Sequence, residues 1–426
     1  MAEDDTAHPP TGTPPASGPA QDGPPTGTPP DGTGRPRRRR RWLMITAGAV
    51  AFLLVATGVL LWIAYRKLDG NIRTDSATDR LLARLEAERP SRTAGARGAE
   101  NILLIGSDDR SGANGSYGGG SGTERSDTTI LLHLAADRGH ATAVSVPRDV
   151  MVSVPACEKP DGTRSKPALM QFNRAFETGG PACSIRTVEK LSGIRIDHYV
   201  ILDFSGFKTM VDAIGGVEVC VPQPIHDKDA RLDLPAGRQT LHGEQALGYV
   251  RARESLGDGS DTQRMGRQQQ FLAALIRKAQ SQGVLLNPAK LWPVLDAATS
   301  SVRADGGLSS LGALYDLTQD LRGVPSADVV FLTAPRRPYR YDSDRDEFVQ
   351  PQTGQLFAAL RDDRPVAVRP PGSSPSPGPS PSPGAGPTAE VAAAVTASGA
   401  ATASPSASAA PTFEGRTADV DACAPH

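Results

Sequence analysis

The sequence lacks the short motifs that mark several common catalytic and metal sites. It has no GxSxG nucleophile elbow and no HExxH zinc motif, and none of its four cysteines belongs to a CxxC pair. It also lacks an excess of charge of either sign, since the formal net charge is −1 over 426 residues. Serine hydrolases, zinc proteases, zinc ribbons and thioredoxin-type proteins are therefore disfavoured, as is a general affinity for nucleic acid.

Both ends of the chain have few large apolar side chains. Residues 1–34 are mainly Pro, Gly, Thr, Asp and Ala, and residues 370–412 are mainly Pro, Ser, Ala, Gly and Thr. Such segments bury too little surface to offset the conformational entropy lost when a backbone is ordered. We therefore expect a disordered basic tail over residues 1–41, a disordered Pro/Ser/Ala-rich tail over residues 366–426, and one large core between them.

One uncharged apolar segment runs from Trp42 to Tyr65, and a helix needs about 20 such residues to cross a membrane. Six arginines lie just before it, between positions 35 and 41, whereas only Arg66 and Lys67 follow closely. This asymmetry predicts a cytoplasmic N-terminus beside anionic membrane lipid, and an extracytoplasmic main domain. A buried core helix, a cleaved signal peptide and a nucleic-acid patch are alternatives that fit the length, flanks and position less well.

All four cysteines follow this segment, in the part expected to face an oxidising compartment. Cys157 and Cys183 bracket a loop that contains Pro, Gly and Lys, so we expect these two residues to pair. That leaves Cys220 to pair with Cys423, which would attach the C-terminal tail to the core. Buried free thiols are the alternative.

Strand and helix patterns alternate after a juxtamembrane helix and linker expected over residues 66–97. Apolar runs typical of strands occur at 101–106, 128–134, 142–147, 198–204, 217–222 and 327–335. Helical spacing occurs at 183–193, 205–214, 242–251, 261–282, 287–300, 308–321 and 353–361. The pattern predicts an α/β fold over residues 98–365: an αβα sandwich around a central mixed β-sheet, preceded by one transmembrane helix.

Charged residues gather in a few motifs, several of them at the ends of predicted strands, where open α/β sheets bind ligands. The motifs are GSDDR (106–110), RSDTT (125–129), SVPRD (145–149), YVRAR (249–253) and DTQRMGRQQQ (261–270). In the last motif Asp261, Arg264 and Gln268 share one helix face. Surface ion pairs and helix caps are the plain alternative for each motif taken alone.

Several arginines together with carboxylates suit a diphosphate ligand. Arg binds phosphate oxygens bidentately and stays charged, and carboxylates such as Asp108 and Asp127 can hold a Mg²⁺ that bridges phosphate oxygens. A glycosidase that used the same two carboxylates would leave the arginines without a role. The glycine loop at 112–122 is not a P-loop, because no GK[ST] follows it. His198 and His226 could be ligands, but isolated histidines of this kind are more often structural or exposed.

The order of these motifs resembles the LytR-CpsA-Psr (LCP) family. NILLIGSDDR, RSDT, SVPRD, NRAFETGG, IDHYVILDFSGF, VDAIGGVEV, YVRAR and DTQRMGRQQQF follow one another over about residues 98–280, and the basic, Pro-rich N-terminus resembles actinobacterial members. The resemblance implies a membrane-anchored ligase that transfers a glycopolymer, with one phosphate, from polyprenyl pyrophosphate to a peptidoglycan hydroxyl. It also implies bound Mg²⁺ and an apolar tunnel for the isoprenoid chain.

The resemblance also implies roles for individual residues, matched motif by motif. Asp108 and Asp127 would coordinate Mg²⁺. The residues that would contact the pyrophosphate are Arg148, Arg251, Arg253, Arg264 and Gln268. Those that would support the site, orient its arginines or act as a base are Arg110, Arg125, Asp149 and Asp261. Candidates for the tunnel wall, with ordinary core as the alternative, are Phe172, Phe176, Val200, Leu202, Phe204, Phe207 and Met210.

Three functions stay open: the glycopolymer phosphotransferase, a hydrolase that uses water as the acceptor at the same site, and a non-enzymatic wall-binding regulator. Only the acceptor separates the first two. Retention of every acidic and arginine motif favours catalysis over binding alone. The sequence departs from many family members in one respect, because its Pro/Ser/Ala-rich stretch leaves no room for a further C-terminal globular domain.

Overall fold

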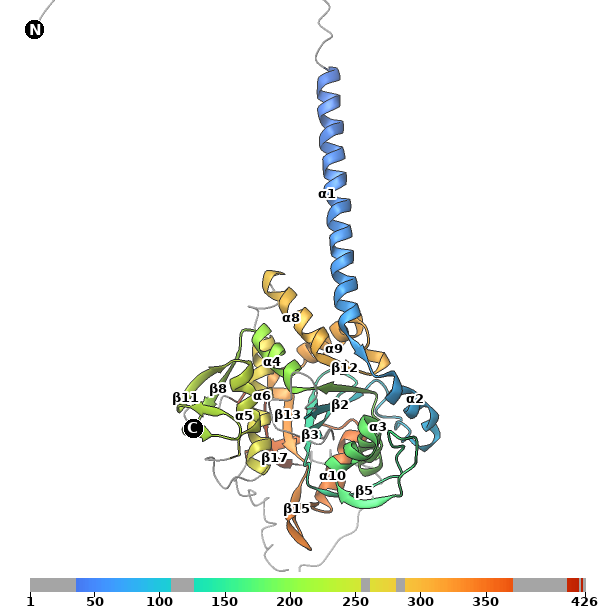
Figure 1. Cartoon of the computed structure of the whole chain (residues 1–426), viewed down its shortest axis with the longest axis vertical. Coiled ribbons are helices and arrows are strands. Elements are labelled where there is room, and N and C mark those ends of the chain that lie inside the picture. The colour runs from blue at the N-terminus through green and yellow to red at the C-terminus, as the bar shows by residue number, and fades with distance from the viewer. Residues whose placement is uncertain are drawn as a thin grey trace, which may run out of the picture. The chain divides into compact units, whose positions relative to one another are not determined.

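The computed structural model describes residues 36–108, 126–253, 261–280, 288–370, 412–420 and 423 (Figure 1). The chain divides into two compact units, Met1–Trp62 and Ile63–His426. The first unit contains most of one long helix. The second contains all the strands and the remaining helices, and it carries the site described below.

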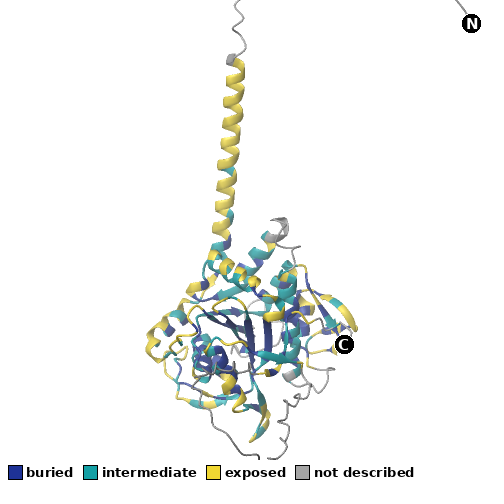
Figure 2. Cartoon of the chain, turned by 180° about the vertical axis from the view of Figure 1, so that it is seen from behind, coloured by how far each residue is buried: buried dark blue, intermediate teal, exposed yellow. Residues whose placement is uncertain are grey.

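Helix α1 (Pro36–Asn71) includes the expected membrane segment. From Arg38 to Asn71 it is long and apolar enough to cross a membrane, and it is the only such helix among the described residues. Its large side chains are exposed, as the yellow colour in Figure 2 shows; Trp42 is 65% and Trp62 is 59% accessible. A helix that is apolar on every side and is not covered by protein requires another apolar environment, which a bilayer provides.

The last turns of α1 belong to the second unit and are fixed by polar contacts. Lys67 Nζ lies 3.1 Å from Asp296 Oδ1 on α8 (Pro288–Ser301), and Asn71 Nδ2 donates to the same oxygen at 3.0 Å. Asp69 accepts from the backbone N–H of Leu311, the first residue of α9 (Leu311–Gly323), at 3.0 Å. The chain then forms β1 (Arg73–Thr74) and α2 (Ser76–Arg84). Residues 66–97 are therefore built into the folded unit rather than forming a free linker.

A mixed β-sheet lies at the centre of the second unit. Its nine strands follow the order β1-β12-β7-β2-β3-β4-β13-β17-β16, and parallel and antiparallel pairs occur together. The strands not yet bounded are β2 (Glu100–Ser107), β3 (Ser126–Leu134), β4 (Ala141–Val146), β7 (His198–Leu202), β12 (Val302–Ala304), β13 (Val329–Thr333), β16 (Ala367–Arg369) and β17 (Thr412–Thr417). The predicted central mixed sheet is confirmed.

Alternate residues of the central strands face two apolar layers, as the period of two in a strand requires. On one face Leu103 and Leu131 pack with α3 (Asn173–Ser192) and α10 (Gln352–Arg361). On the other face Ile130 and Leu134 pack with α6 (Asp261–Gln280) and α9. Figure 1 shows α3 and α10 on one side of β2 and β3, with α4 (Phe204–Ala213), α5 (Gly243–Arg251) and α6 on the other. The αβα sandwich is therefore also confirmed.

Four small two-stranded sheets surround this core. They are β5 (Met151–Val154) with β6 (Ala168–Gln171), β8 (Val217–Val221) with β11 (Gly237–Leu241), β9 (Ile225–Asp227) with β10 (Leu232–Leu234), and β14 (Arg336–Tyr339) with β15 (Asp342–Phe348). Among them, the sequence predicted only β8. α3 contains two helical segments separated by a kink, because Gly179 and Gly180 adopt non-helical dihedrals ahead of Pro181. The segment after the kink agrees with the helix predicted at 183–193, whereas the segment that begins at Asn173 was not predicted.

Both expected disulfides are present. Cys157 is bonded to Cys183, with a Cα–Cα distance of 5.5 Å, and Cys220 is bonded to Cys423, with a Cα–Cα distance of 5.4 Å. No free cysteine is present. The second bridge joins positions 203 residues apart and attaches the end of the chain next to β8.

The expectation of a disordered tail from residue 366 does not hold for two segments. β17 pairs antiparallel with β13 and parallel with β16, so both segments extend the central sheet. Phe413 is 6% exposed, and Ala418, just after β17, is fully buried. The average composition of residues 366–426 did not reveal these strands. A strand of six residues needs only a few inward-facing apolar side chains and the edge of another strand to pair with.

Gly415 tests this packing of β17. A Cβ at position 415 would lie 2.4 Å from the carbonyl oxygen of Phe331 and 2.8 Å from Val368 Cγ1. We expect Gly415→Ala to displace β17 and to lower the free energy of unfolding by about 1–3 kcal/mol, measured by denaturant unfolding of the purified chain in detergent. The matched control is Gly323→Ala in α9, where a Cβ meets no atom within 4 Å. Equal stability of the two variants would contradict this placement of β17.

Candidate functional site

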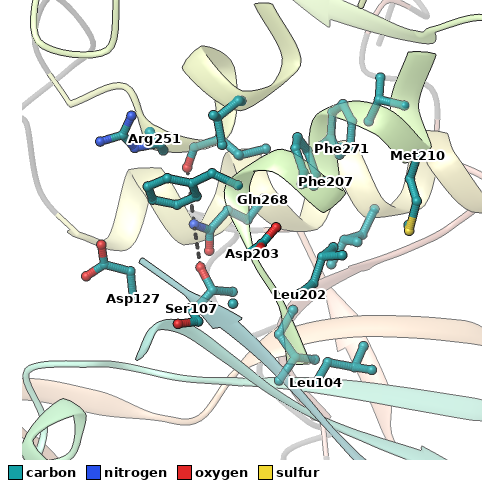
Figure 3. A pocket seen from close by; sticks show the side chains of 18 of the residues that line it. Leu104, Ser107, Asp127, Leu202, Asp203, Phe207, Met210, Arg251, Gln268 and Phe271 are labelled. Carbon is teal, nitrogen blue, oxygen red and sulfur yellow. Dashed lines mark hydrogen bonds between the residues drawn. The ribbon is translucent and has the colours of Figure 1, made fainter. Parts of the chain in front are cut away.

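A cavity of about 660 Å³ lies between the central sheet and helices α4, α5, α6 and α8. Figure 3 shows polar side chains at one end of it, including Asp127, Arg251 and Gln268, and apolar side chains such as Met210 at the other. The volume falls within the range of pockets that bind small molecules and cofactors, about 300–1,000 Å³. The cavity can therefore accept a ligand with a charged end and an apolar end.

A β-bulge places Asp127 at the charged end. Gly106 pairs with Thr128 and Ser107 pairs with Ser126, so Asp127 is the extra residue between two registered pairs. Bulges redirect side chains and are common beside functional sites. Here the bulge lies where β2 ends and β3 begins, and both Ser107 and Asp127 line the cavity.

Arg148 is surrounded by carboxylates. Its Nη1 donates to Asp127 Oδ1 at 2.9 Å and its Nε donates to Asp149 Oδ2 at 3.0 Å, while Asp261 Oδ1 lies 3.6 Å from Nε. Burial alone would lower the pKa of Arg148, but the three carboxylates outweigh it and raise the pKa. For Asp127, burial acts to raise the pKa, but Arg148 and then Arg264 hold it below its usual value. The pair is therefore ionised on both sides at neutral pH.

Arg264 is the most buried cation of the site, with 5% of its side chain exposed. It forms an ion pair with Asp261, one turn earlier on α6, and its Nη2 lies 3.4 Å from the carbonyl oxygen of Asp127. The pKa of Arg264 is lowered to about 10; burial is the main cause, Arg148 and Arg253 act in the same direction, and Asp261 opposes them. Three arginines thus lie close enough to repel one another, an arrangement that favours a polyanionic ligand.

Gln268 and Gln269 hold α6 against the sheet and against α5. Gln268 Nε2 donates to Thr128 Oγ1 and to the carbonyl oxygen of Val250, both at 3.1 Å. Gln269 Nε2 donates to Ser145 Oγ at 3.1 Å and to Thr333 Oγ1 at 3.0 Å. Gln268 lines the cavity, whereas Gln269 does not. The shared face predicted for Asp261, Arg264 and Gln268 is therefore directed at the site.

The two arginines of the YVRAR motif reach the cavity from the end of α5. The guanidinium of Arg251 lies over the ring of Phe204, 4.6 Å from its centroid. The backbone N–H of Arg253 donates to Asp227 Oδ2 at 2.6 Å, and Asp227 Oδ1 accepts from the N–H of Ala230 at 2.7 Å. Asp227 therefore fixes the backbone that carries Arg253. Sequence reasoning missed this residue, because IHDKD resembles an ordinary turn.

The β14–β15 hairpin adds two charged residues that sequence reasoning also missed. Asp346 is 7% exposed, forms an ion pair with Arg336, and its N–H donates to the carbonyl oxygen of Asp149 at 3.2 Å. Burial raises the pKa of Asp346 against the opposing effect of Arg336, and Asp261 and Asp149 raise it further. The hairpin lies far beyond the recognised motifs in the sequence, and the only signal was its run of alternating charges.

The structure brings most of the predicted site residues together. Those that line the cavity are Asp127, Arg148, Arg251, Arg253, Arg264 and Gln268. Asp149 and Asp261 do not line the cavity, but each forms an ion pair with Arg148. Asp108 is buried directly after β2, 5% exposed, and is not among the lining residues. Arg110 and Arg125 lie outside the described residues.

The seven candidates for the tunnel wall divide into two groups. Five of the candidates line the cavity: Val200, Leu202, Phe204, Phe207 and Met210. Phe172 and Phe176 do not, because they lie in the core on the opposite face of the sheet, with 0% and 3% of their surface exposed. Further apolar lining comes from the central sheet, including Leu104 and Ile130, and from the helices, including Phe271, Leu275 and Val294.

The donor set at the strand ends fits Mg²⁺ in chemical type. Asp127 on β3 and Asp108, directly after β2, are carboxylates at the same end of the sheet, and Mg²⁺ prefers such oxygens together with phosphate and water. One carboxylate oxygen of Asp127 is already paired with Arg148, so a cation there would share this carboxylate with the arginine.

Comparison with known proteins gives a consistent result. The model of the LytR_cpsA_psr family matches residues 68–360. The chain is 36% identical to the "Probable cell wall biosynthesis protein LcpB" of Corynebacterium glutamicum, over 61% of this chain and 58% of the relative. It is 27% identical to the polyisoprenyl-teichoic acid–peptidoglycan teichoic acid transferase TagT of Bacillus subtilis, over 68% of this chain and 86% of the relative.

A solved structure shows the same fold. The LytR-Csp2A-Psr enzyme from Actinomyces oris is 24% identical and aligns with a TM-score of 0.50, covering 64% of this chain and 93% of that one. The chain spans 58% of the length of LcpB and 50% of the length of the "Cell wall biosynthesis protein LcpA" of the same organism. The match is therefore to the folded region that these proteins share.

The low pKa of Asp127 predicts a pH-dependent contribution to stability. The pKa is below the unfolded value of about 3.9, so the contribution is complete above that value and is lost as pH falls through the folded pKa. We expect Asp127→Asn to lower the free energy of unfolding at pH 7 by about 1 kcal/mol, and the difference from wild type to shrink below about pH 4. Denaturant unfolding at several pH values measures this. The control is Asp316→Asn, at an exposed position on α9; a deficit for Asp127→Asn that does not change with pH would refute the assignment.

Proposed function

Because the chain belongs to the LytR-CpsA-Psr family, we propose that it is a membrane-anchored phosphotransferase of cell wall assembly. It transfers a glycopolymer, together with one phosphate, from a polyprenyl pyrophosphate carrier to a hydroxyl of peptidoglycan, forming a phosphodiester link. The name of TagT, a polyisoprenyl-teichoic acid–peptidoglycan teichoic acid transferase, describes a donor and an acceptor of these classes.

One observation carries the proposal: an arginine cluster opens directly into an apolar cavity. A polyprenyl pyrophosphate has a diphosphate joined to a long hydrocarbon chain, and each part meets its own environment here. Arginines bind phosphate oxygens in bidentate fashion, and Phe207, Met210 and Phe271 offer apolar surface to the isoprenoid. A soluble sugar nucleotide would leave the apolar end of the cavity unused.

In the proposed reaction the acceptor hydroxyl attacks the phosphorus next to the sugar. The bond from this phosphorus to the bridging oxygen breaks, and polyprenyl phosphate leaves with the proton that the acceptor loses. Negative charge grows on the leaving phosphate, so the main task of the protein is positioning and charge stabilisation. Arg148, Arg251, Arg253 and Arg264 supply fixed positive charge for this purpose, and Gln268 supports the cavity wall beside Thr128.

We further propose that Asp108 and Asp127 hold a Mg²⁺ ion. When bound, this ion would neutralise part of the charge of the diphosphate. The chain itself would keep Asp127 available as an anion, because Arg148 and Arg264 depress its pKa. Asp149 and Asp261 would continue to orient Arg148 whether or not a ligand is present.

The proposed topology has the N-terminus in the cytoplasm and the second unit on the outer side. Its support is the arginine run before α1, the apolar length of α1, and two disulfides in the second unit. The carrier lipid and the nascent glycan are both reached from that side of the membrane.

The function is tested by reconstitution of the full chain in liposomes. The substrates are a polyprenyl pyrophosphate-linked saccharide and nascent glycan strands, with and without Mg²⁺. A phosphodiester-linked glycan product that requires Mg²⁺ is expected. Release of free sugar phosphate alone would establish the hydrolase instead, and the absence of both products would leave only a binding role.

Arg148 gives a residue-level prediction. Arg148→Lys keeps the charge but loses the bidentate fork, and we expect kcat to fall about 10²-fold, as when one charge-stabilising donor is removed from an active site. The matched control is Arg174→Ala on α3, whose side chain is 61% exposed on the opposite layer, and it should leave kcat unchanged. Thermal unfolding of both variants separates a catalytic loss from misfolding. Full activity of a folded Arg148→Lys protein would contradict the role.

Met210 tests the apolar end of the cavity. Met210→Trp places a larger side chain among the lining residues and should raise KM about tenfold or more for a long isoprenoid carrier, with less effect on a short one. The neighbouring control is Thr209→Trp, at an exposed position of α4 outside the lining. An identical KM for long and short carriers in Met210→Trp would show that the chain does not occupy this cavity.

A further inference from the structure

A second polar cluster lies at the opposite end of β3 from Asp127. His133 is the penultimate residue of β3, His140 directly precedes β4, and Asp363 follows α10. One ligand atom from each of the three residues lies within 4.8 Å of the others. His133 lies six positions after Asp127 along β3, roughly 20 Å at about 3.3 Å per residue. The cluster is therefore separate from the proposed diphosphate site.

Both ring nitrogens of His133 lie next to an oxygen that can accept a hydrogen bond. Its side chain is fully buried, Nδ1 lies 2.8 Å from Asn101 Oδ1, and Nε2 lies 2.9 Å from Asp363 Oδ1. A neutral imidazole carries one proton, so it can donate to only one of these oxygens. With Nδ1–H directed at Asn101, the lone pair of Nε2 faces a carboxylate.

His140 and Asp363 are the other two residues of the cluster. His140 Nε2 is buried and has no hydrogen-bond partner among the described residues. Asp363 has a φ of 54°, a left-handed conformation that is uncommon for a residue other than glycine. This backbone directs one carboxylate oxygen at His133, while the other accepts from the N–H of Ala136 at 3.2 Å. A ring nitrogen without a partner, an imidazole facing a carboxylate and a left-handed backbone coincide at one place.

We propose that His133, His140 and Asp363 form a binding site for a divalent transition metal, with Zn²⁺ the best match. Two neutral imidazoles and one carboxylate are typical Zn²⁺ ligands, and a water molecule can take the fourth tetrahedral position. A cation held by Nε2 of His133 and by the Asp363 carboxylate would remove the repulsion between these two groups. Asn101 accepts from Nδ1–H and so fixes the ring orientation, as outer partners of metal-bound histidines commonly do.

The site joins parts of the chain that are far apart in sequence. His133 and His140 border the β3–β4 turn, and Asp363 lies four residues before β16. A bound metal would therefore attach the segment after α10 to the turn between β3 and β4, two inner strands of the central sheet. Since a metal that binds the folded chain adds its binding free energy to stability, the expected role is structural. This role is independent of the proposed transferase function.

His140→Ala is the informative variant, because it removes one ligand without breaking a hydrogen bond to the ring atom Nε2. The purified full chain in detergent is titrated with Zn²⁺ alone, and bound metal is counted by mass spectrometry after dialysis. We expect one Zn²⁺ per chain at this site in the wild type, and an affinity at least about tenfold lower in His140→Ala. Co²⁺ in place of Zn²⁺ should give visible absorption typical of tetrahedral coordination in the wild type and not in the variant.

The matched control is His226→Ala, an exposed histidine on β9 whose side chain is 67% accessible. It should bind Zn²⁺ as the wild type does, and Zn²⁺ should raise the melting temperature of both but not of His140→Ala. Equal binding by wild type and His140→Ala would assign the metal to other residues, such as the carboxylates of the diphosphate site. No binding by the wild type would mean that Asn101 turns its amide nitrogen to Nδ1 and that His133 donates to Asp363 instead. Either result overturns the proposal.

Discussion

The candidate site depends on one electrostatic constraint, the neutralisation of arginines where the central strands meet α6. Arg148 has 20% and Arg264 5% of the side chain exposed, and removing such charges from water costs several kcal/mol per ion. Asp127, Asp149 and Asp261 offset that cost in the free protein. A diphosphate offers the same kind of oxygen, so it can pair with the arginines that face the cavity while Asp149 and Asp261 stay paired with Arg148.

The apolar half of the cavity restricts which anion can benefit from this arrangement. An inorganic phosphate would satisfy the arginines but leave the walls formed by α4 and α6 in contact with water. A lipid without charge would cover the walls but leave the guanidinium groups uncompensated. Only a ligand with both parts satisfies the whole cavity, and the geometry that joins them is set by the bulge at Asp127 and the α5 end that carries Arg251.

The sequence predicted the core of the fold and most of the charged site. The physical reasons for this also explain which residues it did not predict. Buried strands such as β2 and β4 are continuous apolar runs, and Arg148 follows such a run directly, so position alone indicated a site residue. Asp346 and Asp227 could not be predicted, because both reach the site through hairpins whose pairing depends on tertiary contacts. Phe172 was a candidate for the tunnel wall but belongs to the core, its stated alternative, since hydrophobicity does not reveal which face of the sheet a side chain covers.

Strand β17 shows why amino-acid composition alone is a poor predictor of order near the end of this chain. The cost of closing a loop grows only with the logarithm of its length, about 0.6 kcal/mol per doubling, so a long Pro/Ser/Ala-rich connection adds little to the cost of joining β16 to β17. Three features offset this cost: the backbone pairing of β17 with β13, the burial of Phe413 and the Cys220–Cys423 bridge. The edge of β13 would otherwise present unpaired backbone groups to solvent and to other chains. A few residues after a low-complexity stretch thus protect the sheet that carries the site, because their backbone pairs with an edge that the rest of the domain leaves open.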